Sequence, residues 1–278
     1  MLFRLGRLRL RVEILAREVT YRTRRALRIR TRGGRELRHL FEDYNECIVL
    51  ITGRNADGDE VAGSGFHVGR GWIATARHVA DVRQLEIHYK RHVLSIGRVH
   101  FHKDENIDLA IIETDFEEKW FAKVSYLLDP RRTYGRSSFI PLGGHTDDYL
   151  DDGFVLSKIL LMGYPRVPMT AERPMVAVVG EVNALVDKYR TDHPHFVVSV
   201  VPRGGFSGGP VLSEWGFLLG VLTDSLTADP DLVETGFAAV LTIEPLLEIL
   251  AEHEIVPPDW NAKLWHDIVG TTNSGTTS

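Results

Sequence analysis

From about residue 44 the chain is built of short apolar runs separated by Gly, Asp, Asn and Pro, and this alternation constrains the fold most. The runs are rich in Val, Ile, Leu, Phe and Tyr, and no helical pattern separates them. They lie at Cys47–Thr52, Gly65–Val68, Trp72–Thr75, Leu85–Tyr89, Leu109–Glu113, Leu156–Met162, Val176–Val182, Phe196–Val201 and Phe217–Leu222. Many short strands at close spacing predict an all-β sandwich or barrel.

The strands divide into two groups. Residues 126–153 are poorer in strand signals, so we interpret them as a linker between a first β unit at about 44–125 and a second at about 154–241. Thr242 followed by Pro245 and an apolar run predicts a short C-terminal helix over about 243–254. The Gly, Thr and Ser residues near the end of the chain predict a frayed tail within residues 256–278.

Residues 1–40 differ from the rest of the chain in charge. They contain thirteen Arg and three Glu, a balance of +10, whereas the remainder carries −15. Apolar residues recur at helical spacing from Leu5 to Val19, which predicts a basic amphipathic helix as an N-terminal arm. The arm could pack on the acidic body or on a partner protein, which we favour, or bind an anionic surface such as a membrane or nucleic acid.

Cysteine usage and hydropathy bear on the compartment. Cys47, the single cysteine, lies in an apolar run and is interpreted as a small buried hydrophobe. A chain without an internal disulfide is typical of the cytoplasm, which is the expected location. Arginines interrupt every apolar run near the N-terminus, so neither a secretory signal nor a membrane-spanning segment is expected.

Three segments carry residue types suited to acyl transfer. In Gly205-Phe206-Ser207-Gly208-Gly209-Pro210, glycines on both sides of a serine permit a sharp turn whose N–H groups point outward. The amides of Gly205 and Ser207 could hold a developing oxyanion while the Ser207 hydroxyl attacks a carbonyl. A simple glycine-rich turn is the alternative for this segment alone.

The other two segments supply a base and a carboxylate. The run Trp72–Thr75 leads into a turn that presents His78, and an imidazole is the side chain best suited to activate a serine near neutral pH. Asp108 stands at the mouth of an apolar strand, where a histidine N–H would be a suitable partner. Each alone could be structural.

Taken together, these segments resemble the trypsin-like (chymotrypsin-fold) serine proteases, closest to the disulfide-free HtrA-like bacterial branch. The order His78, Asp108, Ser207 matches that family. The resemblance covers about residues 44–250 and implies a trypsin-like peptidase domain over 41–255, built of two six-stranded antiparallel β-barrels. It implies a catalytic triad of His78, Asp108 and Ser207 in the cleft between the barrels, without a cofactor or metal.

The resemblance also suggests how substrate binds. A substrate strand is expected to pair near Val221, Leu222 and Thr223, and Val201 falls at the expected base of the specificity pocket, which would favour an apolar residue before the scissile bond.

The chain departs from the family pattern in two places. Phe206 replaces the Asp or Asn usual before the serine, so activation through a freshly cleaved amine is not expected and the ordering of the oxyanion loop needs another explanation. Too few residues follow position 250 for the peptide-binding PDZ domain of many HtrA-like proteins.

Scattered histidines raise the question of a metal, but no third ligand stands at recognisable spacing, so surface or core roles are expected. They are His67, His88, His92, His100 and His102. The sequence therefore predicts a serine endopeptidase acting on a protein or peptide. The alternative is a catalytically silent protease-fold module that recruits a partner through its cleft or basic arm.

Overall fold

A computed structural model describes residues 36–116, 137–142, 154–187, 193–201, 203–225 and 236–260. The chain divides into two compact units, Met1–His39 and Leu40–Ser278, and the fold described below belongs to the second. Apart from the start of helix α2 (Glu36–Tyr44), the predicted N-terminal arm lies outside the described residues.

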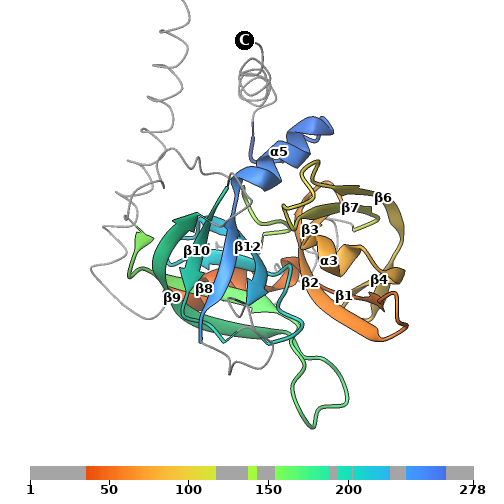
Figure 1. Cartoon of the computed structure of the whole chain (residues 1–278), viewed down its shortest axis with the longest axis horizontal. Helices are drawn as coiled ribbons and strands as arrows, with labels where there is room; N and C mark the ends of the chain where they lie inside the picture. Colours follow the sequence, from red (N-terminus) through yellow and green to blue (C-terminus); the bar gives the residue numbers. More distant parts are fainter. Residues whose placement is uncertain are drawn as a thin grey trace, which may run out of the picture. The chain divides into compact units, whose positions relative to one another are not determined.

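The first β unit is a curled seven-stranded sheet with the order β5-β4-β1-β2-β3-β7-β6 (Figure 1). A short 3-10 turn, η1 (Asn45–Cys47), leads into it. Its elements are β1 (Ile48–Arg54), β2 (Glu60–Gly69), β3 (Trp72–Thr75), the single-turn helix α3 (Arg77–Ala80), β4 (Arg83–Tyr89), β5 (His92–Leu94), β6 (Ile96–Phe101) and β7 (Ala110–Thr114). Every described pairing in it is antiparallel.

The mostly-β fold class is confirmed, but this unit is an open, curled sheet of seven strands where a closed six-stranded barrel was predicted. The terminal strands β5 and β6 do not pair with each other, although Ser95 alone separates them in the chain. The two ends of the sheet therefore meet at a bend in the backbone and not along a hydrogen-bonded ladder. β5 is only three residues long and exposes His92 and Val93, so it offers little edge for closure.

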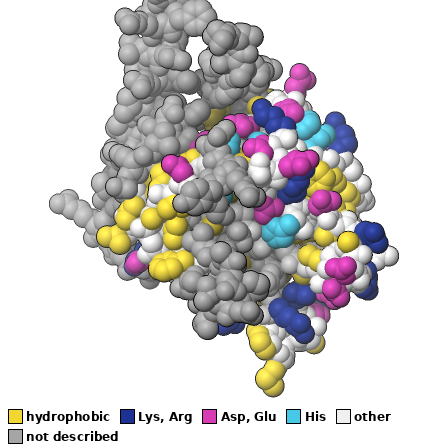
Figure 2. Space-filling view, viewed as in Figure 1, with side chains coloured by type: hydrophobic (Ala, Val, Ile, Leu, Met, Phe, Trp, Pro, Cys, Tyr) yellow, Lys and Arg dark blue, Asp and Glu magenta, His cyan; other side chains and the backbone are white. Residues whose placement is uncertain are grey.

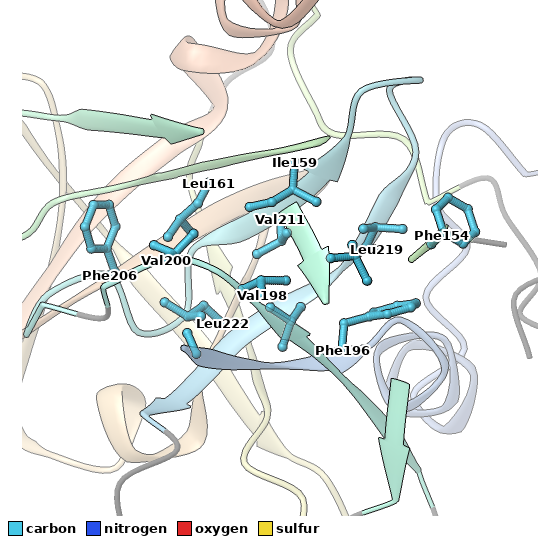
Figure 3. Packing of buried hydrophobic residues seen from close by; sticks show 13 residues of the cluster. Phe154, Ile159, Leu161, Phe196, Val198, Val200, Phe206, Val211, Leu219 and Leu222 are labelled. Atoms are coloured by element: carbon cyan, nitrogen blue, oxygen red, sulfur yellow. The ribbon is translucent and has the colours of Figure 1, made fainter. Parts of the chain in front are cut away.

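The second β unit is a closed six-stranded antiparallel barrel, as predicted. The strands are β8 (Lys158–Gly163), β9 (Val176–Asp187), β10 (Pro194–Val198), β11 (Pro210–Ser213), β12 (Leu218–Ser225) and β13 (Ala238–Thr242). They close in the order β10-β13-β12-β11-β8-β9, with β9 pairing with both β8 and β10. The apolar cluster in Figure 3 fills the barrel, with Phe154 and Phe196 toward one end and Phe206 at the other.

Helix α5 (Glu244–Glu252) follows β13 directly and confirms the predicted C-terminal helix. Pro245 stands in its first turn, and the helix buries one apolar face, including Leu246, Ile249 and Leu250. Pro258, beyond the helix, lies against Gly69 at the end of β2, so the chain returns to the first sheet. No helix among the described residues is long and apolar enough to cross a membrane.

Part of the predicted linker packs against the first sheet. Ile140 donates its N–H to the carbonyl of His67 at 2.9 Å, and Ile140 and Leu142 are fully buried. Cys47 is fully buried as well and donates its thiol to the carbonyl of Ser137 at 3.3 Å. Burial raises the pKa of this thiol, which confirms the interpretation of Cys47 as a structural residue.

Candidate active site

His78 and Asp108 are in direct contact, as the sequence predicted. The Asp108 carboxylate accepts from the His78 side chain, Nδ1 to Oδ2, at 2.7 Å, and from the His78 backbone N–H at 2.9 Å. Two bonds to one residue fix both the position of the carboxylate and the direction of the ring. With Nδ1 as the donor, the other ring nitrogen, Nε2, is the one left to act as a base.

The strand ends and a turn bring these two residues together. His78 lies in α3, immediately after β3, and its neighbour Arg77 donates to the carbonyl of His102 at 3.2 Å. The backbone N–H of His102 in turn donates to the carbonyl of Leu109, next to Asp108, at 3.1 Å. Between them, the Asp104 carboxylate accepts from the backbone and the side chain of Asn106, which shapes the turn that delivers Asp108.

The loop that carries Ser207 comes from the second barrel and contacts β2 and β12. The Ser207 carbonyl accepts from the N–H of Ser64 in β2 at 2.8 Å, and on the other side of the loop Gly208 donates to Leu222 in β12 at 2.7 Å. Gly208 packs so closely here that a Cβ on it would meet the Ser64 carbonyl oxygen and the backbone nitrogen of Ala76, two residues before His78. The loop of Ser207 is therefore held at the junction of the two β units, beside the start of the segment that carries His78.

The backbone before Ser207 is held by two further hydrogen bonds. The Ser64 hydroxyl donates to the carbonyl of Gly205 at 2.6 Å, and Arg166 donates its backbone N–H to the carbonyl of Gly204 at 3.2 Å. Since the N–H and C=O of one peptide point in opposite directions, the contact with Arg166 turns the Gly205 N–H away from the segment that follows β8. Within the described part of the chain, the N–H groups of Gly205 and Ser207 donate to no acceptor.

Ser64 is a positioning residue that the sequence did not identify. Its hydroxyl is fully buried, and besides donating to Gly205 it accepts from the N–H of Tyr164 at 2.8 Å. It thereby connects β2, the end of β8 and the loop of Ser207 through one side chain. Its place in Gly63-Ser64-Gly65 was the only available signal.

Phe206, which precedes Ser207, is held in the apolar cluster of the second barrel. It is 2% exposed and packs in the barrel cluster, where Figure 3 shows it beside Leu161 and Val200. Burial of a phenylalanine contributes roughly 2 kcal/mol or more to the free energy of unfolding. The Phe206 side chain therefore fixes the loop to the core of the second barrel. A phenylalanine at this position cannot form an ion pair with an amino terminus.

Replacing Gly208 by Ala is expected to disrupt this junction. Gly208 has a φ of +84°, and a Cβ there would lie 2.1 Å from the Ser64 carbonyl oxygen. Left-handed strain and the steric overlap together should cost roughly 2–5 kcal/mol of unfolding free energy. Thermal unfolding of Gly208→Ala should show this loss. Gly58→Ala is the matched control, because Gly58 has a φ of +90° with nothing within 4 Å, and a fall of equal size there would contradict the steric account.

The residues predicted to bind substrate have different environments. Val221 and Leu222 are buried, and β12 is paired on both sides at these residues. Val221 lies opposite Pro210 of β11 and Leu241 of β13. Leu222 forms hydrogen bonds with the Gly208–Gly209 turn. The N–H and C=O of Leu222 are both bonded to the loop of Ser207, so Leu222 has no free backbone group to offer to a substrate, which corrects the prediction for that residue. Thr223 lies at an irregularity in the pairing of β12 with β13, between Leu222 and Asp224, and Val201 is 42% exposed.

A histidine and glutamate cluster that the sequence did not predict lies where α5 meets both β units. Nε2 of His102 and Nε2 of His193 lie 3.3 Å and 3.5 Å from Oε2 of Glu248, and ligand atoms of all three residues fall within 4.8 Å of one another. The residues are widely separated in sequence, so no spacing could reveal the cluster.

The tautomer of His102 favours a hydrogen-bond network over a metal centre. The N–H of Asp104 donates to His102 Nδ1 at 3.2 Å, so in the neutral ring the proton is on Nε2, facing Glu248. Histidines that bind metals usually donate their second nitrogen to an acceptor, the opposite of this arrangement. The pKa of Glu248 is lowered to about 2, mainly by the hydrogen bonds from His102 and His193.

This network makes a prediction about acid stability. A carboxyl whose pKa falls from 4.5 when unfolded to about 2 when folded stabilises the protein above pH 4.5, and that contribution disappears as the pH falls towards 2. Allowing for the partial exposure of Glu248, Glu248→Gln should cost about 1–2 kcal/mol of unfolding free energy at pH 7. The difference from wild type should shrink between pH 4.5 and 3, as measured by denaturant unfolding. Glu252→Gln, on the same helix, is the control, and a pH-independent difference would contradict the prediction.

The remaining histidines have structural environments. His67 is fully buried, donates from Nδ1 to Ser138 at 2.6 Å and accepts from the N–H of Gly71 at 2.9 Å. His100 stacks on His253, and burial lowers its pKa. His88 contacts Thr52 and Glu86 at the surface of the first sheet.

The geometry agrees with comparisons to known proteins. The family model for the trypsin-like peptidase domain matches residues 63–221. A search of curated protein sequences finds no match. Among solved structures, the active form of the Rv3671c protease from M. tuberculosis aligns over 83% of this chain and 90% of its own, with 17% identity and a TM-score of 0.54.

Two other structures give the same fold. The HtrA-type protease AlgW with a tripeptide has a TM-score of 0.57 and 14% identity, over 79% of this chain and 63% of its own. A serine endoprotease from Yersinia pestis has a TM-score of 0.52 and 17% identity, over 79% and 66%. The matched segment contains His78, Asp108 and Ser207 and joins the curled sheet to the closed barrel. The chain belongs to the trypsin-like peptidase family.

Proposed function

We propose that this protein is a serine endopeptidase that cleaves peptide bonds through Ser207, His78 and Asp108. The observation that carries the proposal is the pair of hydrogen bonds from His78 to Asp108, which leaves Nε2 as the base while the Ser207 loop is held at the same junction. In general-base catalysis, a carboxylate that orients a histidine in this way fixes the ring tautomer and stabilises the imidazolium that forms.

In the first half of the reaction, the Ser207 hydroxyl attacks the scissile carbonyl carbon while His78 Nε2 takes its proton. The N–H groups of Gly205 and Ser207 stabilise the oxyanion that forms, a contribution typically worth about 3–4 kcal/mol per donor. His78 then gives its proton to the leaving amine, the C–N bond breaks, and an acyl ester remains on Ser207. Asp108 stays ionised and stabilises the imidazolium between these steps.

In the second half, water attacks the ester carbonyl and His78 takes a proton from it. The second tetrahedral intermediate is stabilised by the same two N–H groups. Its collapse breaks the bond to Ser207 Oγ, which recovers a proton from His78, and releases the carboxylic acid product. The step requires no metal or cofactor.

Hydrolysis of an unfolded protein separates this proposal from the alternative of a silent binding module. Wild-type protein at neutral pH should convert a labelled, unfolded casein-like substrate into fragments, with a rate proportional to enzyme concentration. Mass spectrometry of the fragments would also reveal whether cleavage follows apolar residues, as the position of Val201 suggests. Binding of the substrate without new fragments would instead support the binding module.

A further inference from the structure

A groove of about 770 Å³ opens beside the loop that precedes Ser207 and has no role in the proposed chemistry so far. It is bounded by β2, by the segment after β8 and by the nucleophile loop. Its lining residues are Glu60, Val61, Ala62, Arg166, Pro168, Arg173, Arg203 and Gly204. The contact between the Arg166 N–H and the Gly204 carbonyl makes one wall of the groove continuous with the backbone that presents the Gly205 N–H.

The groove lies on one particular side of Ser207. The nucleophile loop bonds to β2 through Ser64 and to β12 through Leu222, so these strands flank Ser207 on opposite sides. If the residues of a substrate before the scissile bond lie along β12, beyond Thr223, the residues after the scissile bond lie on the side of β2. That part of the substrate would enter the groove, because Val61 and Ala62 of β2 form its wall.

The charge of the groove is positive. Three arginines and one glutamate line it, and the glutamate, Glu60, is paired with Arg173 at 3.1 Å. The guanidinium groups of Arg166 and Arg203 are exposed and form no ion pair with any described residue. Figure 2 shows basic side chains gathered in the lower part of the view, by the loop that projects between β8 and β9 in Figure 1.

Unpaired guanidinium groups beside a groove favour a carboxylate ligand. A guanidinium can donate two parallel hydrogen bonds to one carboxylate, which gives both attraction and orientation. A body with an acidic balance of −15 outside residues 1–40 would repel acidic peptides over most of its surface. Positive charge along this groove would therefore favour the docking of an acidic segment there.

We propose that this groove is a leaving-side subsite that selects substrates with Asp or Glu among the first few residues after the scissile bond. The inference rests on the proposed function, because it assumes that a peptide crosses Ser207. Arg166 and Arg203 are its specificity-determining residues.

The test compares two peptides that differ only in charge. Both carry Val before the scissile bond, and one has Glu and the other Gln at the second and third positions after it. Wild-type kcat/KM should be about tenfold higher for the Glu peptide at low salt, and the preference should shrink as ionic strength rises. In the double variant Arg166→Gln/Arg203→Gln the ratio should fall to about one. Arg98→Gln, which removes an exposed arginine from β6, should keep the preference.

A binding measurement tests the subsite even if the peptides are not cleaved. Fluorescence anisotropy with the same peptides is performed on Ser207→Ala and on Ser207→Ala/Arg166→Gln/Arg203→Gln. Tighter binding of the Glu peptide by Ser207→Ala, lost in the variant that also lacks both arginines, supports the subsite. This holds even if the wild-type protein cleaves neither peptide. Absence of cleavage would overturn only the proposed function. Equal affinity for both peptides, or a preference that survives loss of both arginines, would overturn the subsite.

Discussion

Ser207→Ala is expected to abolish peptide hydrolysis, with kcat lower by about 10⁶-fold or down to the detection limit. The methyl group cannot form the acyl ester, and the remaining oxyanion donors can only assist attack by water. The fold should be unaffected, because the loop is held through backbone atoms of Ser207, Gly208 and Leu222 and by the buried Phe206 side chain. Steady-state kinetics and thermal unfolding on the same preparation measure both effects.

Ser95→Ala is the matched control for that variant. Ser95 is exposed and lies at the bend between β5 and β6, so removal of its hydroxyl should leave hydrolysis unchanged. Activity in Ser207→Ala within tenfold of wild type would show that another group is the nucleophile.

Asp108→Asn is expected to lower kcat by about 10⁴-fold while KM changes little. One Asp108 oxygen accepts from the His78 ring and the other from the His78 backbone. An amide has one acceptor oxygen, so if that oxygen keeps the backbone bond, its NH₂ group faces Nδ1 and places the ring proton on Nε2. The base would then be protonated at the nitrogen that must receive the serine proton.

Asp81→Asn serves as the control for loss of a carboxylate near His78, because Asp81 is exposed and lies directly after α3. Its activity should match wild type. If Asp108→Asn retained most of its activity while Asp81→Asn lost it, the assignment of the orienting carboxylate would have to change.

The sequence predicted the parts of the fold that depend on apolar alternation. All nine predicted strand segments overlap observed strands, and the closed second barrel and the helix after Thr242 were predicted correctly. Four strands of the described chain lie outside those segments. The exposed His92, Gly97 and Arg98 disrupt the apolar pattern of β5 and β6, and β11 and β13 were missed as well. The open form of the first sheet depends on the bend at Ser95, which no local pattern encodes.

Within the site, the sequence identified residues whose chemistry is distinctive and missed those that act through position. His78 and Asp108 are in contact as predicted, since one motif places a base and the other a carboxylate at adjacent strand ends. The role of Ser64 emerges only when β2 lies beside the Ser207 loop, and the groove arginines come from segments far apart in the chain. Contacts between residues that are far apart in the chain cannot be predicted from the spacing of residues within one segment.

The most direct test of the account is to locate a covalent adduct on the nucleophile. Folded wild-type protein is treated at neutral pH with a fluorophosphonate probe, digested with a second protease and analysed by tandem mass spectrometry. We expect a single adduct on Ser207, no adduct at that position in Ser207→Ala, and strongly slowed labelling in Asp108→Asn. Folded protein that remains unlabelled, or that carries the adduct on a different residue, would contradict the account.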